Sequence, residues 1–204
     1  MCYSLTDSIL AFIVNITSSM LLFIKYRDIK VRLIAMFSAY IGVMQFWDIM
    51  FWLNPGKTKI NYYSTKMATL WLHMEPIVLV IMIWYLFKNI KNATLVITLI
   101  YVIGMIVYIG YNWRDINYTG RCCGNKIVWD WNYKKYANLL YGIFFLTFMI
   151  AIYQYLDGPI MTLSIIYISF TYIFSLYKYN IDKNSGRFWC FFGAFYPLII
   201  LLSL

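Results

Sequence analysis

Seven long apolar stretches, separated by short polar connections, dominate the chain. They fall at 8–24, 31–53, 67–87, 93–111, 137–156, 159–177 and 188–204. A helix needs about 20 apolar residues to cross a hydrocarbon core of roughly 30 Å. Transmembrane strands alternate apolar and polar residues, and stretches such as 78–86 do not. The pattern predicts an all-α, polytopic transmembrane helix bundle of about seven spans, forming one integral-membrane domain over residues 1–204. Because the first and last stretches are the shortest, six spans plus an interfacial helix is the alternative.

The composition supports a membrane environment. Of the 204 residues, 63% are hydrophobic, 21% aromatic and only 12% charged, a balance that a water-soluble domain of this size cannot hide from solvent. Residues 1–7 contain no basic residue, and the small residues near position 18 make a poor cleavage site for a signal peptide. We therefore expect an integral, multi-pass membrane protein whose first apolar stretch remains as a span.

The net charge of +9 does not indicate nucleic-acid binding, because the basic residues lie at helix ends and in connections, where they contact lipid headgroups. The expected partner of these residues is the lipid bilayer. One membrane face receives Lys25, Arg27, Lys30, Arg32, Lys88 and Lys91, and the other receives Lys57, Lys59, Lys66, Arg114, Arg121, Lys126, Lys134, Lys135, Lys178, Lys183 and Arg187. The total favours a cytosolic N-terminus and the dense first connection favours the reverse, so the charges leave both orientations open. The glycosylation sequons at Asn92 and Asn117 fall on opposite faces and leave the choice open as well.

Two carboxylates and the only histidine lie inside predicted spans, where charged groups are costly and often functional. Asp48 lies near the end of the second span, and His73 and Glu75 lie near the start of the third, so one connection places all three at a similar depth. Gln45 lies one helical turn before Asp48, and Arg187 stands at the start of the seventh span on the same face. These five residues form the candidate intramembrane polar or ion site.

Helical geometry complicates a single site. His73 and Glu75 are two residues apart and point about 200° apart on a regular helix. Pro76 is expected to kink the third span and to free the Leu72 carbonyl from its helical hydrogen bond. The polar residues have two interpretations: contacts that fix helix packing, or a proton or cation site. A water-accessible cavity that reaches Asp48 or Glu75 would favour the second, and dry, satisfied hydrogen bonds the first.

Catalytic and metal-binding patterns are not recognisable. No nucleophile stands beside a base, so we do not expect an enzyme. His73 is alone, and Cys2, Cys122, Cys123 and Cys190 form no CxxC or Cys-His pattern, so we expect no metal site and no cofactor. Most tryptophans are expected in the interfacial belts, and the loop 112–135 is expected to lie on the headgroups.

Three short motifs resemble one family. They are Met44-Gln45-x-x-Asp48-x-x-x-Trp52, Trp71-x-His73-x-Glu75-Pro76 and Gly186-Arg187-x-Trp189-Cys190-Phe191-Phe192 with Pro197. Together they resemble an uncharacterised family of small multi-pass membrane proteins encoded by giant DNA viruses and some protists. The resemblance implies that the protein lies in a virion or host-cell membrane, and it does not indicate any particular activity. Glu75 departs from the Gln-Pro of that pattern.

Two functions remain open from the sequence. The first is a structural or partner-binding component of a viral or host membrane, which associates with itself or with other membrane proteins. The alternative is a small proton or cation channel or transporter that uses Asp48, Glu75 and His73.

Overall fold

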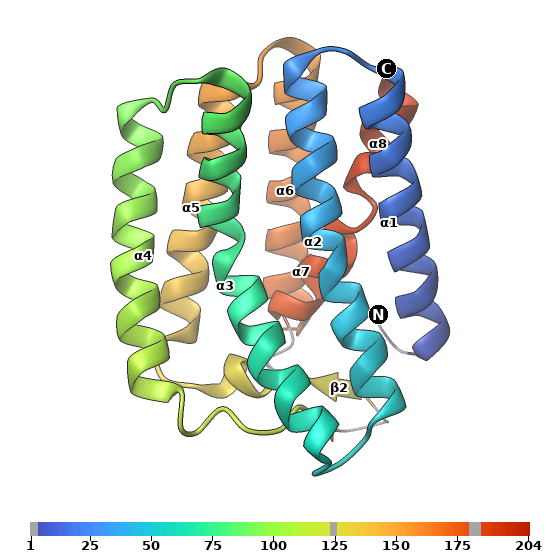
Figure 1. Ribbon diagram of the computed structural model, residues 1–204, viewed down its shortest axis with the longest axis vertical. Helices are drawn as coiled ribbons and strands as arrows, with labels where there is room; N and C mark the ends of the chain where they lie inside the picture. The colour runs from blue at the N-terminus through green and yellow to red at the C-terminus, as the bar shows by residue number, and fades with distance from the viewer. Residues whose placement is uncertain (1–3, 123–125, 180–184) are drawn as a thin grey trace.

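The fold is a bundle of long helices closed at one end by a loop that contains a short β-hairpin (Figure 1). A computed structural model describes residues 4–122, 126–179 and 185–204. The elements are α1 (Leu5–Lys25), α2 (Ile29–Leu53), α3 (Lys59–Phe87), α4 (Asn92–Asn112), β1 (Gly120–Cys122), β2 (Lys126–Val128), the 3-10 helix η1 (Asp130–Tyr133), α5 (Ala137–Tyr155), α6 (Gly158–Tyr179), α7 (Ser185–Gly193) and α8 (Tyr196–Ser203). Within these described residues, seven segments are long and apolar enough to cross a membrane, the last comprising α7 and α8 together. The all-α, multi-pass fold predicted from the sequence is confirmed.

Polar side chains define where the first three helices begin. The Ser4 hydroxyl accepts a hydrogen bond from the amide of Asp7 at the start of α1. Asp28 caps α2 and Thr58 caps α3 through equivalent bonds to amides two and three residues on. These caps satisfy amides that have no partner within the helix. The first three spans therefore each start at a residue with a short oxygen-bearing side chain.

The helices run alternately up and down, so consecutive helices are mostly neighbours (Figure 1). The first and last helices also pack side by side, α8 against α1 (Figure 1). Large apolar side chains such as Ile103, Phe170 and Leu202 are exposed on the outside of the bundle. Such a surface suits contact with lipid tails better than contact with water.

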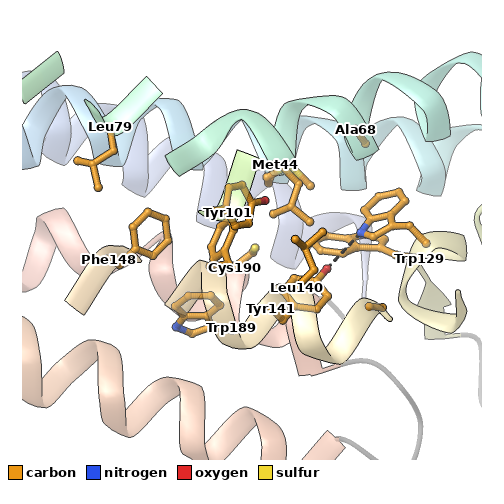
Figure 2. Packing of buried hydrophobic residues seen from close by; sticks show 14 of the residues in the cluster. Met44, Ala68, Leu79, Tyr101, Trp129, Leu140, Tyr141, Phe148, Trp189 and Cys190 are labelled. Atoms are coloured by element: carbon orange, nitrogen blue, oxygen red, sulfur yellow. Dashed lines mark hydrogen bonds between the residues drawn. The ribbon is translucent and has the colours of Figure 1, made fainter. Parts of the chain in front are cut away.

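The interior is rich in aromatic rings. Figure 2 shows Trp129 at one end of the main core cluster and Phe148, Trp189 and Cys190 farther along it. The rings of Phe144 and Phe148 meet edge to face with centroids 4.6 Å apart, a preferred geometry for aromatic pairs. Both residues belong to α5, and Phe144 also meets Trp189 of α7 edge to face with centroids 5.6 Å apart, which packs α5 against α7.

The loop between α4 and α5 folds back over the end of the bundle. Strands β1 and β2 form an antiparallel hairpin, and Trp129 and Trp131 just after it are fully buried. Thr119 precedes the hairpin; its amide donates to the Oδ1 of Asn61 at 3.0 Å, and Asn61 Nδ2 donates to the Thr119 carbonyl. The expectation that this loop lies on headgroups with its tryptophans in an interfacial belt is wrong for Trp129 and Trp131. Their rings instead close the core.

Helix α3 passes through Pro76 without interruption, and it changes direction partway along its length (Figure 1). One turn before the proline, Tyr40 of α2 and Trp71 of α3 stack with ring centroids 4.4 Å apart. The Tyr40 hydroxyl donates to the Trp71 carbonyl, and the Trp71 indole donates to the Tyr40 carbonyl. This reciprocal pair fixes α2 against α3 next to the proline.

The seventh span is broken in its middle. Helix α7 ends at Gly193, and α8 begins at Tyr196, followed by Pro197, which has no amide to donate. Carbonyls freed at a break inside a membrane need donors from elsewhere in the protein. Asn15 of α1 donates to the Ala194 carbonyl at 3.0 Å, and Tyr167 of α6 donates to the Phe192 carbonyl at 2.7 Å. Two neighbouring helices thus support the irregular backbone.

The position of Asn15 depends on a glycine in α2. A Cβ atom added at Gly42 would lie 2.1 Å from the Asn15 Oδ1, a distance that no real pair of atoms tolerates. The missing side chain therefore leaves the space in which Asn15 reaches the break.

We expect Gly42→Ala to destabilise the protein by about 1–3 kcal/mol, the usual cost of overpacking, because the new methyl group displaces Asn15 from the Ala194 carbonyl. The measurement is the unfolding midpoint of the purified protein in lipid nanodiscs. Gly142→Ala in α5 is the matched control, since an added Cβ there meets nothing within 4 Å. Equal midpoints for the two variants would contradict this account of the break.

Candidate functional site

Asp48 and Arg187 form a buried ion pair. The Arg187 Nε lies 3.0 Å from Asp48 Oδ2, and the two side chains are 1% and 0% exposed. The Trp129 indole donates to the other carboxylate oxygen at 2.8 Å, and Arg187 Nη1 donates to the Ile127 carbonyl at 2.7 Å. Both oxygens of Asp48 therefore have a donor.

This pair joins three elements that are distant in sequence. Asp48 belongs to α2, Arg187 to α7, and Ile127 to β2. A buried charge is tolerable only when it is paired and hydrogen-bonded. The arrangement is enclosed and satisfied, which is the geometry of a structural contact between helices and hairpin.

Gln45 lies one turn before Asp48 on α2 and is fully buried. Its side chain belongs to the same polar side of the helix as Asp48. Gln45 therefore places a polar amide group in the interior of the bundle, next to the ion pair.

His73 faces a different group of residues. Its Nδ1 shares a hydrogen bond with the hydroxyl of Tyr101 on α4, at 3.0 Å. Its ring also meets the ring of Tyr108 edge to face, with centroids 5.2 Å apart. Among the residues that the structure describes, the Nε2 atom has no hydrogen-bond partner. His73 thus packs α3 against α4.

Glu75 differs from both Asp48 and His73 in its hydrogen bonding. It is 2% exposed, and among the described residues its Oε1 has no hydrogen-bond partner. Tyr40 and Tyr101 lie within electrostatic range of its carboxyl group. Their hydroxyls are bonded elsewhere, to the Trp71 carbonyl and to His73.

A cavity of about 80 Å³ lies beside Glu75. Its walls come from α2, α3, α5, α6, α7 and α8, and they are mostly aromatic and aliphatic. A cavity volume of only about 10–15 Å³, measured in the same way, is enough to hold one water molecule. The volume therefore suits several waters or a small organic group.

The hydroxyl groups in the cavity wall are all hydrogen-bonded. The Thr171 hydroxyl donates to the Tyr167 carbonyl, and the Tyr167 hydroxyl donates to the Phe192 carbonyl. The Tyr196 hydroxyl is hydrogen-bonded to Ser164 of α6. Glu75 is consequently the polar wall residue whose carboxyl group lacks a bonded partner in the described part of the chain.

The five candidate residues thus fall into three environments: Asp48 with Arg187 and Gln45, His73, and Glu75. Arg187 meets Asp48, as its place at the same membrane face suggests, whereas His73 and Glu75 each face other neighbours. In residues 4–122, 126–179 and 185–204, no three His, Cys, Asp or Glu side chains could hold a metal ion.

Several residues of these environments could not be identified from the sequence. Trp129 and the Ile127 carbonyl come from the loop and become partners of Asp48 and Arg187 only through the tertiary fold. Tyr101, the partner of His73, is one of 20 tyrosines and carries no local signal.

A second, polar pocket lies at the end of the bundle opposite the hairpin. It is lined by Lys30, Lys91 and Asp157 among others, and Lys30 forms an ion pair with Asp157. Leu156 lines both this pocket and the cavity beside Glu75. The two spaces are therefore neighbours.

Comparison with protein-family models, with curated proteins and with solved structures finds no match for this chain.

We expect Asp48→Asn to destabilise the protein by about 3–5 kcal/mol, because it leaves the Arg187 charge buried without its partner. The measurement is the unfolding midpoint in a denaturing-detergent titration. The double variant Asp48→Leu with Arg187→Met removes both charges and should recover most of the loss. A double variant no more stable than the single one would show that the pair is not the source of the effect.

Proposed function

We propose that the protein binds a small, largely apolar molecule inside the membrane, in the cavity beside Glu75. The observation that carries this proposal is a carboxyl group without a bonded partner at the wall of an apolar cavity. Ligand sites are typically apolar cavities with few polar groups that fix the orientation of the ligand.

The cost of an unsatisfied carboxyl group supports a ligand. A polar group without a partner in a low-dielectric interior loses its hydration and gains nothing in return. Asp48, in the same bundle, shows the satisfied alternative, since both its oxygens accept hydrogen bonds. A ligand with a hydrogen-bond donor would donate to the carboxyl group of Glu75, as Trp129 and Arg187 donate to that of Asp48.

The broken seventh span adds a second reason. Gly193 and Tyr196, which bound the break, both line the cavity. Interrupted helices beside a cavity are common where membrane proteins bind and move small molecules. In this proposal the break allows α7 and α8 to move separately when the ligand enters.

The apolar spans indicate a membrane protein, and the resemblance to the viral family suggests which membrane holds it. We propose a virion or host-cell membrane, of which the protein is a binding component. The proposed role is binding rather than catalysis, since the sequence offers no nucleophile with a base.

Access to the cavity can be measured at the thiol of Cys190, which lines it and is 6% exposed. We expect methyl methanethiosulfonate, a small neutral reagent, to modify Cys190 in the folded protein in nanodiscs, as read by mass spectrometry of its peptide. A bulky maleimide should react only after unfolding. Failure of both reagents before unfolding would contradict an accessible cavity.

Proton or cation movement is the second candidate, favoured by the same unpartnered carboxyl group inside a predicted span. It predicts proton or cation flux into liposomes that contain the wild-type protein and loss of that flux in Glu75→Gln. Thr98→Val is the matched control, because it removes a buried hydroxyl of α4 outside the cavity. No flux with the wild-type protein would leave ligand binding as the function.

A further inference from the structure

The chemistry of the cavity wall restricts which ligand it can hold. Lys, Arg and His are missing from the described residues that line it, and Glu75 is its acidic residue. Arg187 and His73 are committed to Asp48 and Tyr101. In the described part of the wall, no basic side chain is present to neutralise a charge on Glu75 or to attract an anion.

Aromatic rings form much of the same wall. Phe37 meets Phe148 edge to face at 5.2 Å between centroids, and Trp189 meets Phe144 in the same way at 5.6 Å. All four residues line the cavity with Glu75. The faces of aromatic rings attract ammonium groups, most strongly where water is excluded.

A carboxylate together with aromatic rings is a complement to an organic cation. The carboxylate accepts N–H hydrogen bonds and balances the charge, while the rings contact the C–H groups beside the nitrogen. The same surroundings disfavour a phosphate or a carboxylate, because they would place two negative charges together in a low dielectric. The volume of about 80 Å³ suits a small head such as an aminoalkyl group.

We propose that the ligand of this cavity is an alkylammonium compound, with its nitrogen at Glu75 and its carbon chain against Phe37, Phe148 and Trp189. The inference rests on the proposed function, since it names the class of molecule that the cavity beside Glu75 binds. Leu156 lines both this cavity and the polar pocket at the end of the bundle.

The experiment compares two thiol reagents of similar size at Cys190. One is 2-aminoethyl methanethiosulfonate, which carries an ammonium group, and the other is the neutral 2-hydroxyethyl methanethiosulfonate. Rates are measured in nanodiscs for the wild type and for Glu75→Gln, which keeps the size of the side chain and removes its charge. Thr98→Val again serves as the control outside the cavity.

We expect Glu75→Gln to lower the ratio of the aminoethyl rate to the hydroxyethyl rate about tenfold, which corresponds to about 1.4 kcal/mol. The hydroxyethyl rate itself should stay unchanged, which shows that the variant is folded and its cavity open. Protection of Cys190 by n-butylammonium chloride, and not by 1-butanol, should accompany the preference in the wild type.

The two proposals fail in different ways. Labelling by both reagents at a ratio that Glu75→Gln leaves unchanged would overturn the ammonium site and keep the accessible cavity. Absence of labelling by either reagent before unfolding would overturn the cavity and, with it, both proposals.

Discussion

Inside a hydrocarbon layer each polar group must find its partner within the protein, because no water is there to supply one. The bundle meets this constraint at its most irregular points. Asn15 and Tyr167 support the broken backbone of the seventh span. Arg187, with Trp129, satisfies both oxygens of Asp48 and joins α2, α7 and the hairpin. The hairpin is in turn held by Asn61 at Thr119. The contacts that close the bundle are therefore polar ones set into an apolar, aromatic interior.

Against this background Glu75 stands out. It shares its helix with His73 and its degree of burial with Asp48, yet its Oε1 lacks a bonded partner among the described residues. A structural carboxylate would be expected to have donors such as those around Asp48. The difference between the two carboxylates separates the structure-holding part of the bundle from the part with which we associate function. Burial alone does not distinguish them, whereas their partners do.

The sequence predicted the fold well, because apolar length alone specifies a transmembrane helix and needs no tertiary information. It also placed Arg187 at the membrane face where it meets Asp48. It could not predict that the loop buries Trp129, since an aromatic residue suits a membrane interface and a core equally well. The break in the last span was not foreseen either, because it depends on donors from Asn15 and Tyr167 on other helices. Pairing between residues more than a hundred positions apart leaves no local pattern in a single sequence, so Glu75 could not be told from Asp48.

We propose that Glu75, and not Asp48, is the carboxylate that contacts a ligand. Infrared difference spectroscopy of the protein in nanodiscs, with and without n-butylammonium chloride, observes carboxyl groups themselves and so distinguishes the two residues. We expect a carboxylate band to change when the amine is added, and this change to be absent in Glu75→Gln. The same change in Glu75→Gln as in the wild type, or no change in either, would overturn the assignment to Glu75.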